Sequence, residues 1–356
     1  MKLEVSVPEL VEVFKEIQKQ PEQIVEMIRL DVREIVGDYM TAMMNAELTH
    51  FLGREPYARS QGDVNHHLGG YVCRATFAAV HEIIRQGIND LTVSRSNTSD
   101  DFDMLIGAGL VKRFIATFCS LGPHGLGRCY RRSLEKGIPH KVEIEEYTNL
   151  SLPMMFPAGA TGMPFVPVKD MIGTDLLKIK SFFGDNKYKV IDSPFDGKPV
   201  LLVPALNPDV AIVHVQQSDE TGNAQMWGIG GDCKYGANAA KKVIVTCERI
   251  VSRELIGKDP SRTIVASPKV VAVVEEPFAS HPGYTPGFYD VDFPFGEVYR
   301  DASNTPEGFK QFLDEWVYGI KDRTHYISHY IERFGYEAFR NLQAEFDYSY
   351  PVSYSY

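Results

Sequence analysis

The sequence predicts an α/β protein in which a mainly parallel sheet is flanked by helices, with a helical segment at the N-terminus. Short runs rich in Val, Ile and Leu recur along most of the chain, and most are continuously apolar, as in strands buried on both faces. Helical stretches lie between several of these runs, which is the element order of a parallel sheet. The first part of the chain has helical spacing instead.

Residues 1–70 differ in character from the rest of the chain. Between residues 8 and 52, apolar residues recur every three or four positions, with charged residues between them. From Phe51 to Gly70 this pattern gives way to a polar stretch with several glycines, which is typical of a loop or linker. We therefore expect two units, a helical segment over 1–70 and an α/β domain over 71–356.

The elements of the α/β domain follow from the apolar runs in order. The predicted strands are Leu91–Ser94, Phe114–Phe118, Phe165–Val168, Val200–Val203, Val210–Val215, Val243–Cys247 and Val270–Val274. The predicted helices between them include Ala75–Gln86, Tyr130–Lys136 and Met154–Ala160. Helical spacing returns between Pro306 and Phe346, and we expect this tail to cap the sheet.

The charge balance narrows the class of function. The 356 residues contain 37 Lys and Arg against 47 Asp and Glu, which gives a net charge of −10. Because nucleic-acid binding is driven by a basic surface, this balance argues against a general nucleic-acid-binding protein. It leaves room for a local basic pocket that binds one phosphorylated ligand.

The cysteines and the apolar runs indicate a cytoplasmic protein. The five cysteines are scattered and form no Cys-x-x-Cys pair, so we expect reduced, buried thiols and no zinc site. The N-terminus has acidic residues where a signal peptide needs basic ones. No apolar run approaches the ~18 residues of a membrane span.

A loop rich in glycine and arginine follows the predicted strand Phe114–Phe118. In open parallel sheets, ligands bind at the carboxyl ends of the strands. Backbone N–H groups of the glycines and the N-terminus of the next helix can bind an anion there, and the arginines add positive charge. The alternative is a flexible turn before a solvated basic helix face. The residues concerned are Ser120, Gly122, Gly125, Gly127, Arg128, Arg131 and Arg132.

Two adjacent carboxylates, Glu145 and Glu146, end another run near Tyr147. A strand places alternate residues on opposite faces, so the two cannot both face one site. One can reach a ligand while the other faces away, and the alternative is ordinary surface charge.

Two further loops bring polar groups to predicted strand ends. Gly173 and Thr174 offer a backbone N–H and a hydroxyl after the strand at 165–168. Gln216 and Gln217 stand at the end of the run at 210–215, where their amides either orient a thioester carbonyl or satisfy the turn. Neither loop identifies a ligand on its own.

No metal site is expected. His81 and Glu82 begin a zinc-protease pattern, but Arg85 occupies the position of the second histidine. An acidic cluster lies at a predicted helix start, where carboxylates favour the helix dipole, and we interpret it as structural. It consists of Asp100, Asp101 and Asp103.

From about Phe77 onward, the chain resembles the A-type subunit of the family I coenzyme A transferases, the glutaconate CoA-transferase group in particular. Segments that carry the resemblance include AAVHEIIRQGINDLT (78–92), DFDMLIGAGLVKRFI (101–115), VEIEEYTNLSLPMM (142–155), GMPFVPVKDMIGTDL (162–176), DVAIVHVQQSDETGNAQMWG (209–228) and AVVEEPFASHPGYTPGFYDVDFPF (272–295). They occur in order along the chain.

This resemblance implies transfer of CoA from an acyl-CoA to a free carboxylic acid, through a glutamate that forms covalent acyl and CoA intermediates. In two-subunit members that glutamate lies in the B-type subunit, in a Glu-Asn-Gly type motif. The present sequence contains neither Glu-Asn-Gly nor Glu-Gly-Gly. The resemblance therefore implies a hetero-oligomer in which this chain supplies no catalytic nucleophile, with CoA as a substrate and no permanently bound cofactor.

The resemblance also gives a set of candidates for binding the substrates. These are Ser120, Gly122, Gly125, Arg128, Arg131, Glu146, Asn149, Gly173, Thr174, Gln216 and Gln217.

A related group with the same fold hydrolyses ring-derived CoA esters, and it carries an acidic residue a few positions after the Glu-rich strand. The corresponding residue here is Asn149, whose amide cannot act as a general base. This difference favours a transferase, and part of an acyl-CoA hydrolase is the alternative.

Residues 38–70, DYMTAMMNAELTHFLGREPYARSQGDVNHHLGG, are similar to the N-terminal region of mutator-type insertion-sequence transposases. The catalytic acids of such a transposase lie further along the chain, where this sequence already resembles a CoA-transferase. We therefore expect a fusion near Gly70 in which the first strand of the transferase fold is missing or poor. A catalytically inert fusion product is the remaining alternative.

Overall fold

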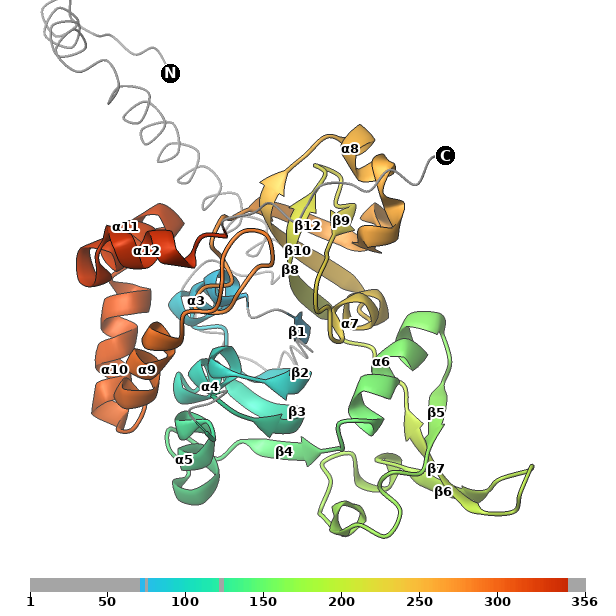
Figure 1. Ribbon diagram of the computed structural model, residues 1–356. Coiled ribbons are helices and arrows are strands. Elements are labelled where there is room, and N and C mark those ends of the chain that lie inside the picture. Colours follow the sequence, from blue (N-terminus) through green and yellow to red (C-terminus); the bar gives the residue numbers. More distant parts are fainter. Residues whose placement is uncertain (1–70, 74–75, 122–124, 345–356) are drawn as a thin grey trace, which may run out of the picture.

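The computed structural model describes residues 71–73, 76–121 and 125–344 (Figure 1). The segment 1–70, including the transposase-like residues, lies outside them. The strands are β1 Tyr71–Cys73, β2 Leu91–Thr98, β3 Val111–Cys119, β4 Glu143–Glu146, β5 Phe165–Val168, β6 Lys189–Asp192, β7 Pro199–Pro204, β8 Val210–Ser218, β9 Ala224–Gln225, β10 Lys242–Ile250, β11 Thr263–Val265 and β12 Val270–Glu275. Strands and helices alternate as predicted, and the α/β class is confirmed.

Parallel strands form the centre of the molecule. One sheet has the order β11-β9-β8-β10-β12, and its long strands β8, β10 and β12 run parallel. A second sheet, β2-β3-β4, is parallel throughout. All nine residues of β8 are buried, as the continuous apolar run predicts.

The first described strand is very short. β1 pairs in parallel with β8, with Tyr71 opposite Ala211 and Cys73 opposite Val213. It lies between β8 and β2, and so between the two parallel sheets (Figure 1). The expectation of a poor first strand is confirmed in the sense that only these three residues form it.

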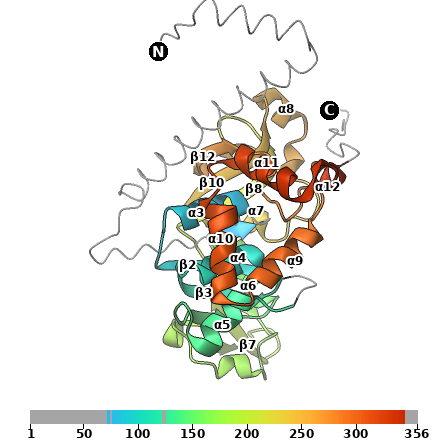
Figure 2. The ribbon, with the colours of Figure 1, turned by 90° about the vertical axis from the view of Figure 1, so that its left-hand side faces the viewer.

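Helices cover the sheets and complete two apolar cores. They are α3 Phe77–Arg85, α4 Asp100–Gly107, α5 Arg128–Lys136, α6 Ser151–Thr161, α7 Cys233–Ala239, α8 Arg253–Lys258, α9 Phe293–Ala302, α10 Pro306–Leu313, α11 Arg323–Phe334 and α12 Tyr336–Leu342, with a π-helical turn at Asp314–Tyr318. The C-terminal helices α9 to α12 lie together over α3 and α4, on the side that Figure 2 turns toward the viewer. The tail therefore caps a sheet, as predicted.

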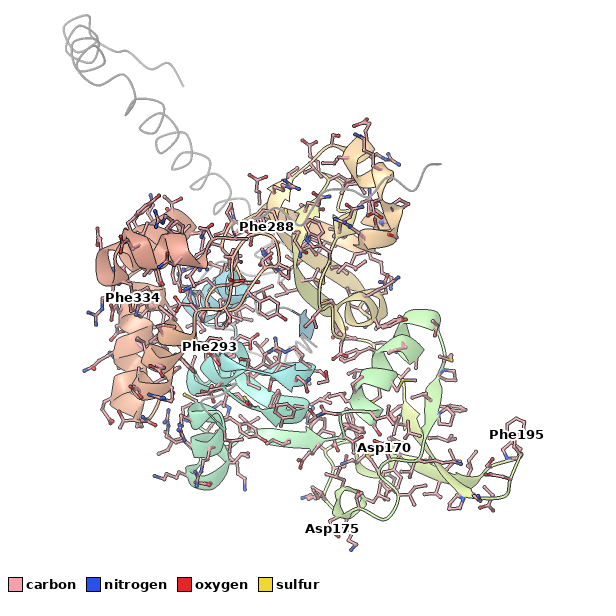
Figure 3. All side chains as sticks on the ribbon, viewed as in Figure 1. Asp170, Asp175, Phe195, Phe288, Phe293 and Phe334 are labelled. Carbon is pink, nitrogen blue, oxygen red and sulfur yellow. The ribbon has the colours of Figure 1, made fainter. Side chains whose placement is uncertain are left out.

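A third, antiparallel sheet stands apart from the parallel ones. Its order is β5-β7-β6, and the hairpin of β6 and β7 projects away from the rest of the molecule (Figure 3). Phe195, at its tip, is 97% exposed. In β5, Val166 and Val168 are buried whereas Phe165 and Pro167 are exposed, which is the alternation of a strand with one solvated face.

The cysteines agree with expectation in part. Cys119, Cys129 and Cys247 are free and buried. Cys233 takes part in a disulfide bond, so the prediction of reduced thiols throughout is wrong for this residue. Within the described ranges, no helix is both long and apolar enough to cross a membrane.

Candidate functional site

The carboxyl ends of β2, β3 and β4 form an edge with several polar side chains. The strand arrows of this sheet point toward α6 and the antiparallel sheet (Figure 1). Because parallel strands end on the same side, residues far apart in sequence meet there. We use the term carboxyl edge for Ser96, Thr117, Ser120, Glu146, Asn149 and Asp232.

Hydrogen bonds connect four of these residues across three strands and a loop. The Ser96 hydroxyl donates to the carboxylate of Asp232, directly before α7. The Thr117 hydroxyl has one proton and two acceptors, the Ser96 backbone oxygen and Asn149 Oδ1 at 2.8 Å. The exposed Asn149 therefore keeps its amide N–H groups for a ligand.

The N-terminus of α5 already binds an anion from within the protein. Asp103 accepts hydrogen bonds from the backbone N–H of Tyr130 at 2.7 Å, the N–H of Cys129 at 3.3 Å and the hydroxyl of Tyr299 at 2.8 Å. Only glycine fits at position 127, since a Cβ there would lie 2.5 Å from Asp103 Oδ1. The prediction that these helix amides bind an external anion is therefore wrong.

The acidic cluster is structural, as predicted, although its partners differ from those expected. Asp101 forms a two-point ion pair with Arg95, at 2.7 and 2.9 Å, in the buried interior. Asp103 stabilises the neighbouring helix α5. Only Asp100 acts at the start of its own helix, where Ser99 Oγ donates to it at 3.1 Å.

The predicted residues of the glycine–arginine loop have different surroundings. Arg128 Nε is buried and has no hydrogen-bond partner among the described residues, so this guanidinium can still bind a ligand. Arg131 is exposed and pairs with Glu135 at 2.7 Å, one turn along α5. Gly125 has a φ of +89° in the turn that follows Ser120, and Gly122 lies outside the described residues.

The two adjacent glutamates face opposite ways, which confirms the prediction from strand geometry. Glu145 is fully buried, where it pairs with Lys187 Nζ at 2.8 Å and accepts from Ser181 Oγ at 2.5 Å. Glu146 is half-buried and has no hydrogen-bond partner in the described structure. Burial raises the pKa of nearby Tyr130 to about 12, and Cys119 and the Glu146 carboxylate raise it further.

The loop with Gly173 and Thr174 is joined to the carboxyl edge through Asp170, which Figure 3 labels. Asp170 accepts hydrogen bonds from Thr148 Oγ1 and, at 2.8 Å, from Ser151 Oγ. The Thr174 hydroxyl donates to Met171 O at 2.8 Å within its own turn, and Gly173 is exposed with a φ of +83°. Thr174 thus satisfies the turn in this structure.

Gln216 and Gln217 are buried and their amides are already bonded. Gln216 Nε2 donates to Trp227 O at 2.9 Å, and its Oε1 accepts from Trp227 N at 3.3 Å. Gln217 bonds Gln225 at 2.7 Å and accepts from Arg249 at 3.0 Å. Of the two alternatives open for these residues, the geometry supports the one in which they hold the turn.

Sequence reasoning missed Ser96, Thr117 and Asp232. The predicted strand ended at Ser94, whereas β2 continues to Thr98, so Ser96 was left out. A polar run such as Arg95-Ser96-Asn97-Thr98 directly after an apolar strand is the signal that could have found it. The described residues contain no group of three or more His, Cys, Asp or Glu side chains suited to a metal ion.

The fold and the carboxyl edge define an α/β protein with an open, polar site at the ends of parallel strands. The family model described as coenzyme A transferase matches residues 64–276. The chain is 40% identical to the A-type subunit of glutaconate CoA-transferase from Acidaminococcus fermentans over 274 residues, covering 73% of this chain and 85% of that protein. It therefore belongs to the coenzyme A transferase family, and its enzyme class is that of a CoA-transferase.

Two further comparisons agree. The chain is 36% identical to the A-type subunit of 3-oxoadipate CoA-transferase from Pseudomonas knackmussii, covering 72% of this chain and 88% of that protein. Its structure is similar to the crystal structure of glutaconate coenzyme A-transferase from Acidaminococcus fermentans, with a TM-score of 0.71, 36% identity, and coverage of 79% of this chain and 92% of the other. Both sequence relatives are thus named as one of two kinds of subunit.

Proposed function

We propose that this chain is the A-type subunit of a two-subunit CoA-transferase that moves CoA from an acyl-CoA to a free carboxylic acid. The observation that carries the proposal is the composition of the carboxyl edge in a member of this family. The edge offers amide, hydroxyl and carboxylate groups for binding, while the sequence has no Glu-Asn-Gly motif to supply the nucleophile. The nucleophilic glutamate then comes from a separate B-type subunit.

In this proposal the covalent chemistry belongs to the partner. A glutamate carboxylate attacks the thioester carbonyl and displaces CoA thiolate, which leaves an acyl anhydride on the enzyme. The thiolate then attacks that anhydride at the glutamate carbonyl, which forms an enzyme thioester and releases the first acid. The second acid reverses these steps and leaves with CoA.

The residues of this chain bind and orient the reactants. Asn149 donates its amide N–H groups to a carboxylate or thioester oxygen, held in place by Thr117. Arg128, whose Nε has no protein partner in the described structure, pairs with an anionic group of CoA or of the acid. Glu145 is not part of this set, because Lys187 and Ser181 occupy its carboxylate.

Exposed apolar side chains near the carboxyl edge support a covering partner. Leu150 follows Asn149 and is 54% exposed, and Ile229, three residues before Asp232, is 75% exposed. Phe118 and Leu126 flank Ser120 and are also exposed. Apolar side chains gathered around a polar centre are typical of a protein interface.

Activity assays on this chain by itself and together with its B-type partner test the proposal. We expect no turnover by the chain alone and acid-dependent CoA transfer by the pair. Turnover by the chain alone, abolished by Glu146→Gln, would show that it carries its own nucleophile. Release of CoA by the pair without an acceptor acid would identify a hydrolase instead.

We further propose that residues 1–70 form a unit separate from the α/β domain. The family match begins at residue 64, close to the change in sequence character, which supports this boundary. Limited proteolysis should cut between Gly53 and Gly70 and leave the α/β domain as the resistant fragment. Resistance of that stretch, together with amide protection equal to that of Val210–Val215, would show that it has been built into the sheet.

A further inference from the structure

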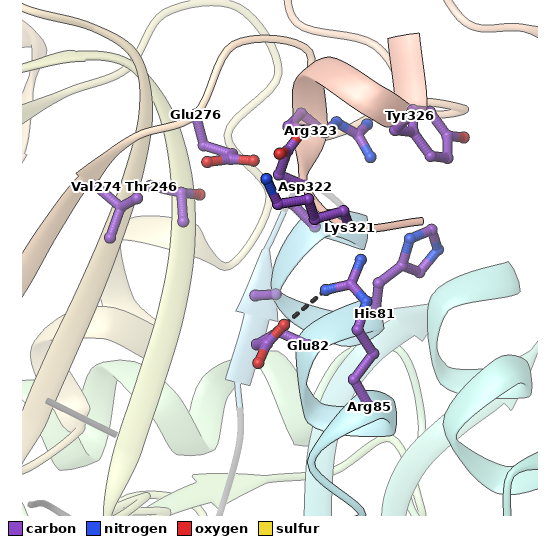
Figure 4. Close-up of a pocket in the computed structure, with 12 residues that line it drawn as sticks. His81, Glu82, Arg85, Thr246, Val274, Glu276, Lys321, Asp322, Arg323 and Tyr326 are labelled. Atoms are coloured by element: carbon purple, nitrogen blue, oxygen red, sulfur yellow. Dashed lines mark hydrogen bonds and ion pairs between the residues drawn. The ribbon is translucent and has the colours of Figure 1, made fainter. Parts of the chain in front are cut away.

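A second polar pocket lies away from the carboxyl edge and shares no residue with it (Figure 4). It opens between α3, the strands β10 and β12, and the start of α11. Figure 4 shows Glu276 and Thr246 on the strand side and His81 on the helix side. The lining residues are Ala78, Ala79, His81, Glu82, Arg85, Thr246, Val274, Glu276, Lys321, Asp322, Arg323 and Tyr326.

Three polar groups of this pocket have no hydrogen-bond partner among the described residues. His81 is 3% exposed, and neither of its ring nitrogens has such a bond. Arg323 is 8% exposed, and its Nε is buried without a partner. The Glu276 carboxyl group is half-buried and likewise has none. Buried polar groups are nearly always satisfied, so three together indicate a ligand.

The remaining charged groups with a known role are already engaged. Arg85 pairs with Glu82 at 2.6 Å and donates to Val317 O at 3.0 Å. Asp322 caps α11 by accepting from His325 N at 2.8 Å. Another nitrogen of Arg323 reaches backbone oxygens of Phe278 and His281, and its guanidinium lies 3.9 Å from the Tyr326 ring centre. The groups still open to a ligand are thus His81, Arg323 Nε and Glu276.

We propose that this pocket binds the carboxylate of a small organic acid between Glu276, His81 and Arg323. The carboxylate accepts hydrogen bonds from Arg323 Nε–H and from one ring N–H of the neutral His81. Its other oxygen shares a proton with the Glu276 carboxyl group. Ala78 and Ala79 leave room for a short carbon chain only.

The charges around the pocket select a monoanion. Lys321, Arg85 and Arg323 provide three positive charges, and Glu82, Asp322 and Glu276 provide three negative ones. A phosphate with two negative charges meets repulsion from these carboxylates, whereas a carboxylate that binds together with one proton leaves the balance unchanged. An ammonium group leaves the buried Arg323 Nε–H unsatisfied.

The protonation of both acceptors fits this ligand. Burial raises the pKa of Glu276 to about 7; Asp322 and Glu248 also raise it, while Arg323 and Arg85 lower it. Burial lowers the pKa of His81, and the nearby Arg85, Arg323 and His281 lower it further, so the imidazole is neutral and keeps one N–H to donate. The binding form therefore carries a protonated Glu276.

Calorimetric titration of the full chain with acetate tests the proposal in the absence of CoA and of any partner chain. If only protonated Glu276 binds, acetate affinity falls about tenfold between roughly pH 6 and pH 8. Glu276→Gln mimics the protonated form, so it should bind acetate equally at both pH values. His81→Phe keeps the ring contacts with Phe77 and Tyr326 and should weaken binding about tenfold.

The controls separate this site from the proposed active site. Glu332→Gln, at an exposed glutamate of α11, and Asn149→Ala, at the carboxyl edge, should bind acetate as the wild type does. Thermal unfolding of each variant checks that it is folded. The proposal is overturned if the wild type shows no saturable binding at the lower pH, if Glu276→Gln keeps the pH dependence, or if Asn149→Ala abolishes binding. None of these outcomes bears on whether the chain and its B-type partner transfer CoA.

Discussion

The carboxylate of Asp103 in α4 accepts a hydrogen bond of 2.7 Å from the backbone N–H of Tyr130 at the start of α5. Through this contact a side chain of one helix does for the next helix what an N-cap residue normally does from within it. Asp103 also accepts from Tyr299 in α9, so one buried group joins three helices.

Asp103→Ala should destabilise the α/β domain by about 2–4 kcal/mol. Removal of the carboxylate leaves the N–H of Tyr130 and the hydroxyl of Tyr299 buried without acceptors, and each such group costs about 1–3 kcal/mol. Chemical denaturation measures the change. Asp175→Ala, at an exposed residue paired with Lys178, is the matched control and should change stability by less than about 1 kcal/mol.

Glu145 and Glu146 should respond to substitution in opposite ways. Glu145→Gln leaves Lys187 as an unpaired charge in the interior and should destabilise the protein by about 3–5 kcal/mol. Glu146→Gln should leave the melting temperature nearly unchanged, because its carboxylate has no partner in the described structure. Equal melting temperatures for the two variants would contradict the assignment of Glu145 to a structural ion pair.

Asn149→Asp should change the outcome of the reaction in the two-subunit complex. A carboxylate at this position no longer donates to a substrate oxygen, so transfer should fall about tenfold. It can also act as a base toward water, so CoA release without an acceptor acid should rise. Asn186→Asp, at another exposed asparagine, should alter neither rate. Unchanged transfer in Asn149→Asp would remove this residue from the site.

Arg128→Ala should raise the Michaelis constant of the complex for one of its anionic substrates. Loss of a charge-assisted hydrogen bond is worth about 1.5–3 kcal/mol, or roughly 10- to 150-fold. Arg131→Ala serves as the control, since that side chain is exposed and paired with Glu135. The same small effect from both variants would assign the two arginines to a solvated helix face.

Asp100→Asn should stabilise the protein above neutral pH but not in acid. Burial raises the pKa of Asp100 to about 7, and Asp101 and Asp103 raise it further, against a hydrogen bond from Ser99. Because the folded-state pKa exceeds the unfolded value of 3.8, the wild type loses stability as the pH rises from about 4 to about 7. The melting-temperature advantage of the variant should grow over that interval and then remain constant. An advantage that is independent of pH would contradict the raised pKa.

The apolar pattern was sufficient to predict the α/β class, most strands and the capping tail, because burial on both faces requires continuous Val, Ile and Leu runs. The site could be predicted only where its residues follow those runs directly, as Asn149 does. The role of Asp103 depends on a contact between separate helices, and the bonds of Gln216 to Trp227 depend on how a later loop folds back. Local sequence carries no signal for such partners.

The short strand β1 determines how force and motion pass between the two parallel sheets. Only three residue pairs, from Tyr71–Ala211 to Cys73–Val213, join it to β8, whereas β8 and β10 are paired along their whole length. Each sheet also has its own apolar core. Under tension this narrow seam should part before either sheet loses a strand. The two halves can therefore pivot about residues 71–73 without losing their internal order, which brings the carboxyl edge of one half under the mechanical influence of the other.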